Sequence, residues 1–254
     1  MEIIPYTGMK NRKFKKRIHN GMFIWTDPSE HIQQQIFWYG FYERKYVLTW
    51  EGILKNNWVV LDIGAHTGYY SLIASGKTNN GHVYAFEPDS GSVLQIRENL
   101  QLNKLKNVEV VHIAVSDKDS HATFYKAARG NTGMSGLTQP ENFSGATESV
   151  QTIRIDSWWR KNQVQRIDCI KMDIEGGEYK ALEGMRDLLQ QFHPILFIEI
   201  SAELLQRHGN TPSQIFELLY SFQYRSYQVR KPNELVRVDS VIEDELVVFI
   251  HALG

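Results

Sequence analysis

Cysteine is almost absent from this 254-residue sequence, in which Cys169 stands alone. A single cysteine allows no disulfide within the chain, and unpaired cysteine is typical of proteins in the reducing cytosol. No apolar run reaches the roughly 18 residues that a membrane-spanning helix needs. Residues 1–8 also lack the basic-then-apolar pattern of a secretory signal. We therefore expect a soluble, cytoplasmic protein with no membrane partner.

Net charge is also nearly absent, since 28 Lys and Arg are balanced by 29 Asp and Glu. A chain without a strong positive field gives no argument for nucleic acid as a partner. One stretch near the N-terminus is the exception, and we interpret it as a solvated basic edge. A contact with an anionic substrate group or a membrane surface is the alternative. Its residues are Lys10, Arg12, Lys13, Lys15, Lys16 and Arg17.

The sequence does contain a regular alternation of strand and helix patterns. Five segments have the composition of buried strands and are followed by helical patterns or turns: 58–62, 82–87, 108–113, 168–173 and 195–200. Such alternation predicts a parallel, doubly wound sheet. Two more strands, near 224–229 and 246–251, have no helix between them, so the last should be antiparallel. We expect an α/β fold with a seven-stranded, mostly parallel sheet and helices on both faces.

We expect a single domain over residues 1–254, because the sequence shows no repeat, low-complexity tract or linker. Residues 1–55 should form a hairpin and two helices that cap the ligand-binding edge of the sheet. Residues 56–254 should form the core, interrupted at about 118–155 by a hairpin insertion. The loop of this insertion is rich in Gly, Ser and Asn, and it is either substrate-facing or simply flexible.

The first helix is predicted to open at residues 27–30. Asp27 is a good cap, proline is favoured at the first helical position, and Glu30 would return a hydrogen bond to the cap. A second helix is expected over residues 41–54. Both helices precede the sheet and are candidates for a cover over the active site.

The segment from Val59 to Tyr70 carries the clearest local pattern. Branched apolar residues up to Ile63 predict a strand buried on both faces, and the following Asp-x-Gly-x-x-x-Gly predicts a turn that leads into a helix. Gly64 and Gly68 allow close approach of the backbone to a ligand. The helix that follows begins with free N–H groups suited to an anion. Asp62 ends the strand, where open α/β sheets bind their ligands.

Glu87 ends the next strand, 19 residues after the second glycine of this turn. An acid at about this distance typically binds ribose hydroxyls, as found for dinucleotides and for S-adenosylmethionine. His66 stands where a dinucleotide turn has its middle glycine. Asp62 would repel a pyrophosphate but would suit the amino group of a bound amino acid. With Ser116 and Asp117 at the end of a later strand, the pattern favours S-adenosylmethionine.

On these residues the sequence resembles the FkbM family of S-adenosylmethionine-dependent methyltransferases, which have the class I Rossmann-like fold. The similarity spans roughly residues 40 to 220, and its last main motif is the most specific, because many methyltransferases share the glycine turn. The four main motifs lie at 60–68, 86–88, 114–117 and 170–178, and the pieces at 40–43 and 197–200 fit as well.

The resemblance implies roles for the motif residues. The methionine part of the cofactor would be surrounded by Asp62, Gly64, Ala65 and Gly68. The ribose would be held by Glu87, and the adenine bordered by Ser116 and Asp117. Members of the family are generally regarded as O-methyltransferases of sugars or natural products. The resemblance therefore implies a small-molecule or glycan hydroxyl as acceptor.

Methyl transfer to a hydroxyl requires alignment of the acceptor and a base within reach of its proton. Asp173 ends its strand beside the cofactor cleft and is the first candidate, with Glu175 and Glu199 as competitors. Lys171 points to the same face as Asp173 and could orient the substrate or lower the pKa of a carboxylate. His66 could face the cofactor carboxylate or the acceptor.

Several alternatives stay open from the sequence. The three carboxylates Asp173, Glu175 and Glu199 could bind a divalent cation, although we do not predict a metal. The acceptor atom could be a nitrogen or a carboxylate, or the protein could bind S-adenosylmethionine without catalysis. The glycine spacing disfavours a nicotinamide oxidoreductase. The oligomeric state is open, with a homodimer as one option.

Overall fold

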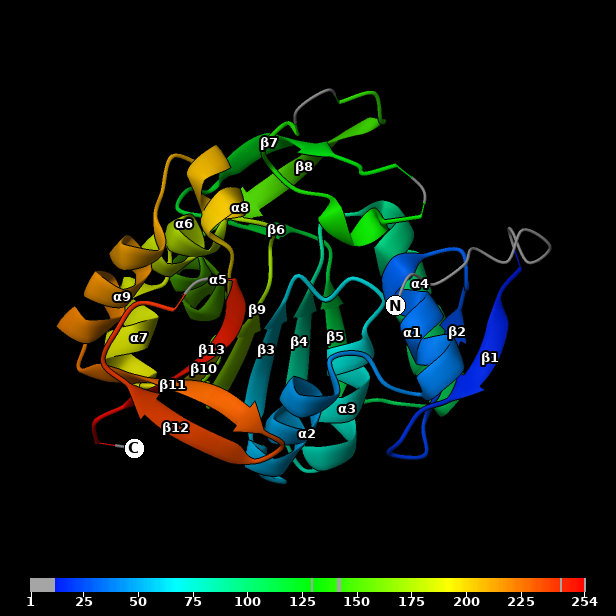
Figure 1. Cartoon of the computed structure of the whole chain (residues 1–254), viewed down its shortest axis with the longest axis horizontal. Helices are drawn as coiled ribbons and strands as arrows, with labels where there is room; N and C mark the ends of the chain where they lie inside the picture. Colours follow the sequence, from blue (N-terminus) through cyan, green and yellow to red (C-terminus); the bar gives the residue numbers. More distant parts are fainter. Residues whose placement is uncertain (1–11, 129, 141–142, 243, 254) are drawn as a thin grey trace.

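A mixed eight-stranded sheet forms the centre of the computed structural model, which describes residues 12–128, 130–140, 143–242 and 244–253 (Figure 1). The strand order is β12-β11-β13-β10-β9-β3-β4-β5. The five adjacent strands β10, β9, β3, β4 and β5 run parallel to one another. Strand β13 runs antiparallel to β10 and β11, and β12 runs antiparallel to β11. The strands are β3 (Val59–Ile63), β4 (His82–Phe86), β5 (Val108–Val111), β9 (Cys169–Met172), β10 (Ile195–Ile200), β11 (Tyr224–Lys231), β12 (Glu234–Val238) and β13 (Glu245–His251).

The fold class predicted from the sequence is confirmed, with one strand more than expected. The antiparallel last strand, β13, lies between β10 and β11. The additional strand, β12, is a short edge strand in which no residue is fully buried. It therefore lacks the apolar run by which a buried strand is recognised in a sequence.

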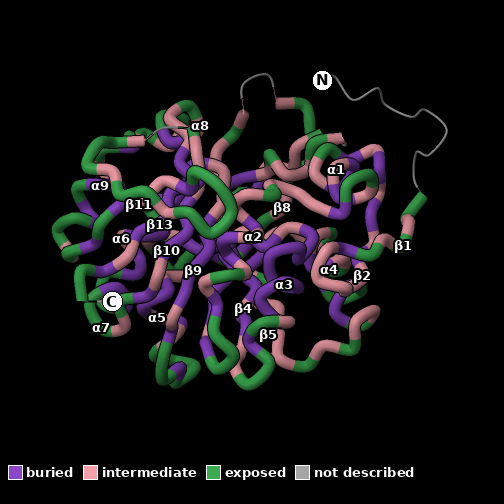
Figure 2. The backbone as a smooth tube through the Cα atoms, turned by 60° about the horizontal axis from the view of Figure 1, so that its bottom comes forward, coloured by how far each residue is buried: buried purple, intermediate pink, exposed green. Residues whose placement is uncertain are grey.

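Successive residues of a strand point to opposite faces of the sheet. Both faces carry apolar side chains, and helices cover both of them. Val60 packs in one apolar cluster with residues of α1 to α4, whereas Leu61 and Ile63 pack in another with residues of α5 to α9. Figure 2 shows the buried trace running through the middle of the molecule. The helices are α1 (His31–Tyr39), α2 (Arg44–Ile53), α3 (Tyr69–Lys77), α4 (Ser90–Asn103), α5 (Ile155–Lys161), α6 (Glu178–Glu183), α7 (Arg186–Phe192), α8 (Ala202–Arg207) and α9 (Pro212–Ser221). In the described part of the chain, none of them combines the length and apolar character of a membrane-spanning helix.

The start of the first helix differs from the sequence prediction. β1 (Phe14–Arg17) and β2 (Phe23–Thr26) form the expected hairpin, but α1 begins at His31 rather than at Pro28. The carboxylate of Asp27 accepts hydrogen bonds from the N–H (3.0 Å) and hydroxyl (2.6 Å) of Ser29, which closes a turn instead of capping a helix. Glu30 is freed from the expected capping role, and its carboxylate is used elsewhere.

A second, three-stranded sheet lies beyond the carboxyl ends of the parallel strands (Figure 1). Its order is β6-β8-β7, and β7 and β8 pair antiparallel where the sequence predicts a hairpin. The loop between them contains a short 3-10 helix, η1, and returns to β7 through a bridge between Tyr125 and Gly136. The elements are β6 (Ala114–Val115), β7 (Ser120–Tyr125), η1 (Thr132–Met134) and β8 (Thr147–Ile153).

The chain changes direction across the sheet between β3 and β9, and Gly64 lies at this switch point. It follows β3 directly with a φ of +81°, and a Cβ there would lie 1.8 Å from the carbonyl oxygen of Asp173. The glycine is thus required by the neighbouring strand as well as by the backbone conformation. Its position brings the end of β9 against the turn after β3.

Replacing Gly64 by alanine should destabilise the protein more than a positive φ alone explains. Gly209 is a matched control, because its φ is +75° and no atom of the residues that the structure describes lies within 4 Å of the position that a Cβ would take. Gly209→Ala should lower the free energy of unfolding by about 1–2 kcal/mol. Gly64→Ala should lower it clearly further in the same denaturant titration. Equal losses would show that Asp173 can move away from the turn without cost.

Candidate active site

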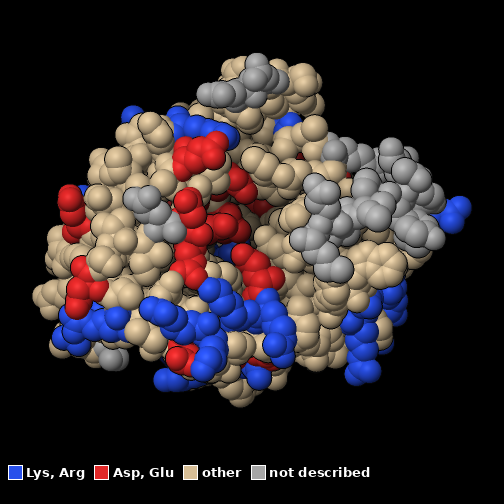
Figure 3. Space-filling view, in the orientation of Figure 1, with Lys and Arg blue, Asp and Glu red and all other residues tan. Residues whose placement is uncertain are grey.

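A cavity of about 430 Å³ opens between the carboxyl ends of the parallel strands and the β6-β8-β7 sheet. This volume is within the range of small-molecule sites. Figure 3 shows acidic side chains gathered along the hollow on this face, above a band of Lys and Arg. The lining includes eight of the residues selected from the sequence: Gly64, His66, Glu87, Ser116, Asp117, Asp173, Glu175 and Glu199.

The other residues of the glycine turn lie behind the cavity. Asp62, Ala65 and Gly68 are buried and do not line it. Oδ2 of Asp62 accepts a hydrogen bond of 2.5 Å from the Ser71 hydroxyl, while Oδ1 has no hydrogen-bond partner among the described residues. Burial raises the pKa of Asp62, and the Lys171 ammonium opposes this shift. The structure thus places Asp62 beside a buried lysine rather than on the cavity wall.

Glu87 is held at the end of β4 by backbone donors on both sides. Its Oε2 accepts the N–H of His66 at 2.7 Å, and its Oε1 accepts the N–H of Asp89 at 2.8 Å. Each oxygen therefore keeps a further lone pair for a ligand. The side chain is buried apart from its cavity side, and burial raises the pKa of Glu87 to about 7. An ionised Glu87 would gain from additional hydrogen-bond donors in the cavity.

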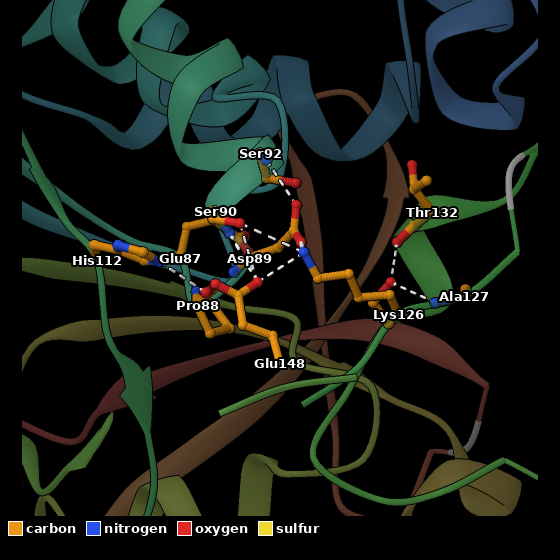
Figure 4. A network of polar contacts seen from close by, with 11 residues as sticks. Glu87, Pro88, Asp89, Ser90, Ser92, His112, Lys126, Ala127, Thr132 and Glu148 are labelled. Carbon is orange, nitrogen blue, oxygen red and sulfur yellow. Dashed lines mark hydrogen bonds and ion pairs between the residues drawn. The ribbon is translucent and has the colours of Figure 1, made fainter. Parts of the chain in front are cut away.

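Lys126 joins the hairpin insertion to the start of α4 (Figure 4). Its Nζ lies 2.8 Å from Oδ1 of Asp89 and 2.7 Å from Oε2 of Glu148. Asp89 also caps α4 through the N–H of Ser92 at 2.7 Å, and Ser90 donates to Glu148 at 3.0 Å. Burial opposes the ionisation of Asp89, but these contacts outweigh it and lower its pKa. The network fixes β7 and β8 against the helix that follows Glu87.

Asp173, Lys171 and Glu199 form a connected group at the ends of β9 and β10. The Lys171 ammonium, which is almost fully buried, lies 3.0 Å from Oδ2 of Asp173. Burial opposes the ionisation of Asp173, but Lys171 and a hydrogen bond with Glu199 outweigh it and lower its pKa. The negative charge of Asp173, together with burial, raises the pKa of Glu199. Of the two carboxyl groups, Glu199 therefore binds a proton more readily than Asp173.

This pairing bears on the sequence-based choice of Asp173 as general base. One oxygen of the carboxylate binds an ammonium group, and a hydrogen bond with Glu199 also lowers the pKa of this carboxylate. A carboxylate with a lowered pKa is a weak proton acceptor. Asp173 is thus better suited to hold a positive or hydrogen-bond-donating group than to remove a proton.

The two remaining acids of the motif have different environments. Burial raises the pKa of Glu175 to about 8, with a further contribution from Asp173, and its backbone has a φ of +57°. Glu178 is buried in the first turn of α6, and its Oε1 accepts the N–H groups of Ile174 (2.9 Å) and Gly176 (3.3 Å). Glu178 therefore holds the turn that precedes its own helix.

The structure gives no geometric support to the alternative of a metal ion bound by Asp173, Glu175 and Glu199. Within the described ranges, no group of three or more His, Cys, Asp and Glu is placed to hold a metal.

Three residues of the site region were not selected from the sequence. Glu43 precedes α2 with a φ of +48°, and its carboxylate accepts a 2.8 Å hydrogen bond from the Tyr70 hydroxyl. Burial raises the pKa of Glu43, and Asp173 adds to this shift. Glu30 and Thr132 come from the loop before α1 and from η1, and they are hydrogen-bonded to each other at 2.8 Å. The motif at 40–43 could have pointed to Glu43, whereas no sequence signal marks the other two.

The sheet order, the acids at successive strand ends and the cavity between them have the arrangement of the class I methyltransferase fold. The family profile described as "Methyltransferase FkbM domain" matches residues 62–228. The match covers more than half of the chain, and this protein belongs to the FkbM methyltransferase family.

Two curated relatives are similar over most of the chain. The 2-O-methyltransferase NoeI of Sinorhizobium fredii is 28% identical over 180 residues, which cover 65% of this chain and 72% of that protein. The hexuronic acid methyltransferase AglP of Haloferax volcanii is 26% identical over 161 residues, covering 63% of this chain and 61% of that protein. The match thus spans less than two thirds of AglP.

Two solved structures share the fold at low sequence identity. The FkbM methyltransferase from Methylobacillus flagellatus has a TM-score of 0.51 at 17% identity, covering 79% of this chain and 45% of that longer chain. TYW2 of M. jannaschii, solved in complex with AdoMet, has a TM-score of 0.51 at 14% identity, covering 95% of this chain and 85% of that chain. At such identities the similarity concerns the fold alone.

Proposed function

We propose that this protein transfers the methyl group of S-adenosylmethionine to a hydroxyl of a small molecule or glycan. The observation that carries the proposal is the cavity at the β3/β9 switch point, which has Glu87 on one side and the Asp173 group on the other. The names of NoeI and AglP, which denote a 2-O-methyltransferase and a methyltransferase of a sugar acid, support an acceptor of this class.

The lining residues suit the parts of this cofactor. Apolar side chains of Ile113, Val115 and Phe124 provide a surface for an adenine ring, with Ser116 and Asp117 at its polar edge. Glu87 has free lone pairs for two ribose hydroxyls.

The carboxylate side of the cavity suits the amino-acid end of the cofactor and the acceptor. Asp173 would attract the cationic part of the cofactor, and Glu175 and Glu199 would contact the acceptor. When bound, the cofactor supplies an electrophilic methyl group on a positively charged sulfur. The residues then have to align the acceptor oxygen, exclude water and take up a proton.

Calorimetry with S-adenosylhomocysteine is the first test, and the folded protein should bind it. A panel of hydroxylated sugars and small molecules should then be screened with cofactor carrying an isotopically labelled methyl group, with and without a chelator. Label in an ether is the expected result. Failure of the folded protein to bind S-adenosylhomocysteine contradicts the proposal. If the labelled methyl group is found in an amine or an ester, the acceptor is a nitrogen or a carboxylate instead of a hydroxyl. Binding without transfer to any acceptor favours a non-catalytic cofactor-binding protein.

A further inference from the structure

Thr132 is the meeting point of three segments that are far apart in the sequence: the loop before α1, the turn after β3, and η1. The Glu30 side chain, which is buried, accepts at Oε1 the N–H of Gly130 (2.9 Å). Its Oε2 accepts both the N–H (3.1 Å) and the hydroxyl (2.8 Å) of Thr132. Because a carboxylate can only accept, the Thr132 hydroxyl uses its single proton on Glu30.

The imidazole of His66 lies on the other side of this hydroxyl, with Nε2 at 3.2 Å from Oγ1 of Thr132. Since the hydroxyl proton is already donated to Glu30, Oγ1 can only accept from His66, and Nε2 must carry a proton. Burial lowers the pKa of His66, so the ring is neutral at neutral pH and its Nδ1 is unprotonated. Nδ1 has no hydrogen-bond partner in the described part of the chain, and His66 lines the cavity.

We propose that Glu30, acting through Thr132, holds His66 in the Nε2–H tautomer so that Nδ1 accepts the proton of the acceptor hydroxyl. This inference rests on the proposed function. In the transfer, a bond forms between the acceptor oxygen and the methyl carbon, sulfur keeps the electrons of the broken S–CH3 bond, and the hydroxyl proton moves to Nδ1. His66 is then the catalytic residue, and Thr132 and Glu30 are positioning residues.

The charges around the ring support proton uptake at this place. Asp173 and Glu30 favour the imidazolium that forms, and so does Asp89 before α4, whereas Lys171 and burial oppose it. Asp173 is the competing base, but its carboxylate is already bound to Lys171 and Glu199. A contact between Nδ1 and the carboxylate of the cofactor would need a proton on Nδ1, which the Thr132 hydrogen bond disfavours.

The tautomer can be measured without an acceptor, by two-bond ¹H–¹⁵N NMR correlation on protein labelled at histidine nitrogen. We expect Nε2 of His66 to be protonated and Nδ1 unprotonated. Thr132→Val should produce a mixture of tautomers, whereas Thr132→Ser should keep the single form. His19, which contacts Glu51 at 3.0 Å, should be unchanged in both variants. Protonated Nδ1 in the wild type, or an unchanged tautomer in Thr132→Val, would overturn the proposal.

Kinetics with an acceptor identified by the screen tests the proton transfer itself. His66→Gln should lower kcat by at least about 100-fold, the usual contribution of a general base. Its affinity for S-adenosylhomocysteine should stay within about threefold of the wild type. In the wild type, kcat should rise with pH through the pKa of His66, which lies below the ordinary 6.5, and this limb should be absent in the variant.

The two assays separate the possible failures. Loss of S-adenosylhomocysteine binding in His66→Gln would assign His66 to the cofactor and refute its role as base. An unchanged kcat in His66→Gln, or a pH limb that persists in this variant, would also refute the role of His66 as base. If no hydroxyl acceptor is found, the proposed function fails, while the NMR result still decides whether Glu30 and Thr132 set the tautomer.

Discussion

Replacing Lys171 by methionine should lower the free energy of unfolding by about 3–5 kcal/mol, the usual cost of removing one partner of a buried ion pair. The Lys171 ammonium is almost fully buried, lies 3.0 Å from Asp173 and also stabilises the buried Asp62. Although burial alone would lower the pKa of Lys171, the carboxylates of Asp173 and Asp62 raise it. Methionine keeps most of the volume and removes only the charge. Both acids would then be left without their cation.

A denaturant titration of Lys171→Met measures this loss, with Lys161→Met as the control. Lys161 is exposed, and its replacement should change the stability by no more than about 0.5 kcal/mol. If Lys171→Met is as stable as the wild type, Asp62 and Asp173 must be able to take up protons in place of the lysine charge.

The loss caused by Lys171→Met should depend on pH in a defined direction. The folded-state pKa of Asp173 is depressed, so its contribution to stability is present above the unfolded-state value of about 3.9. That contribution disappears as the pH falls through the lower, folded-state value. The difference between wild type and variant should therefore be full at neutral pH and shrink in acid. A difference that is independent of pH would show that lost packing, not lost charge, is responsible.

Replacing Glu87 by glutamine should weaken the binding of S-adenosylhomocysteine by about 10- to 100-fold. Under the proposed function, Glu87 accepts hydrogen bonds from ribose hydroxyls, and a bond to a charged group contributes about 1.5–3 kcal/mol. Calorimetry measures the change, and a melting curve verifies that the variant is folded. Glu109→Gln is the control, since Glu109 is an exposed acid on the neighbouring strand β5. Equal affinities of Glu87→Gln and wild type would remove Glu87 from the ribose site.

The affinity of the wild type should also rise with pH where Glu87 ionises. Burial raises the pKa of Glu87 to about 7 in the free protein. Hydroxyl donors favour the ionised form, so ligand binding lowers this pKa and releases a proton around and below pH 7. The affinity should therefore increase as the pH rises through about 7, and it should be flat over this range in Glu87→Gln. A wild-type affinity that falls with rising pH would contradict the assignment.

The residues that the sequence could predict for this site lie at the ends of strands. Glu87 follows β4 and Asp173 follows β9, and parallel strands bring their carboxyl ends to one edge of the sheet. Asp89 caps α4 through the N–H of Ser92, which is only three residues away in the sequence. Lys171 and Asp173 are two residues apart on an extended strand, so their side chains meet. In each case the controlling interaction is local or follows from the regular geometry of the sheet.

The start of the first helix was predicted wrongly, because two local patterns compete for the same aspartate side chain. The first helix was expected to start at Pro28, but Asp27 is engaged by Ser29, and its N–H by the side chain of Gln33. Asp62, which the sequence assigns to the cofactor, is buried and pairs in register with Lys171 on β9. Which partner a side chain finds across the sheet is set by strand order, which the local pattern does not contain.

The sequence by itself determined the α/β class, the glycine turn after β3 and the acids that line the cavity. These features depend on periodicity, backbone preference and side-chain type, which are properties of short segments. Tertiary structure alone decided that Glu30 and Thr132, 102 residues apart, contact each other and His66. It also decided that the pKa of Glu199 is raised beside Asp173, because a pKa depends on burial and on charges brought near by the fold.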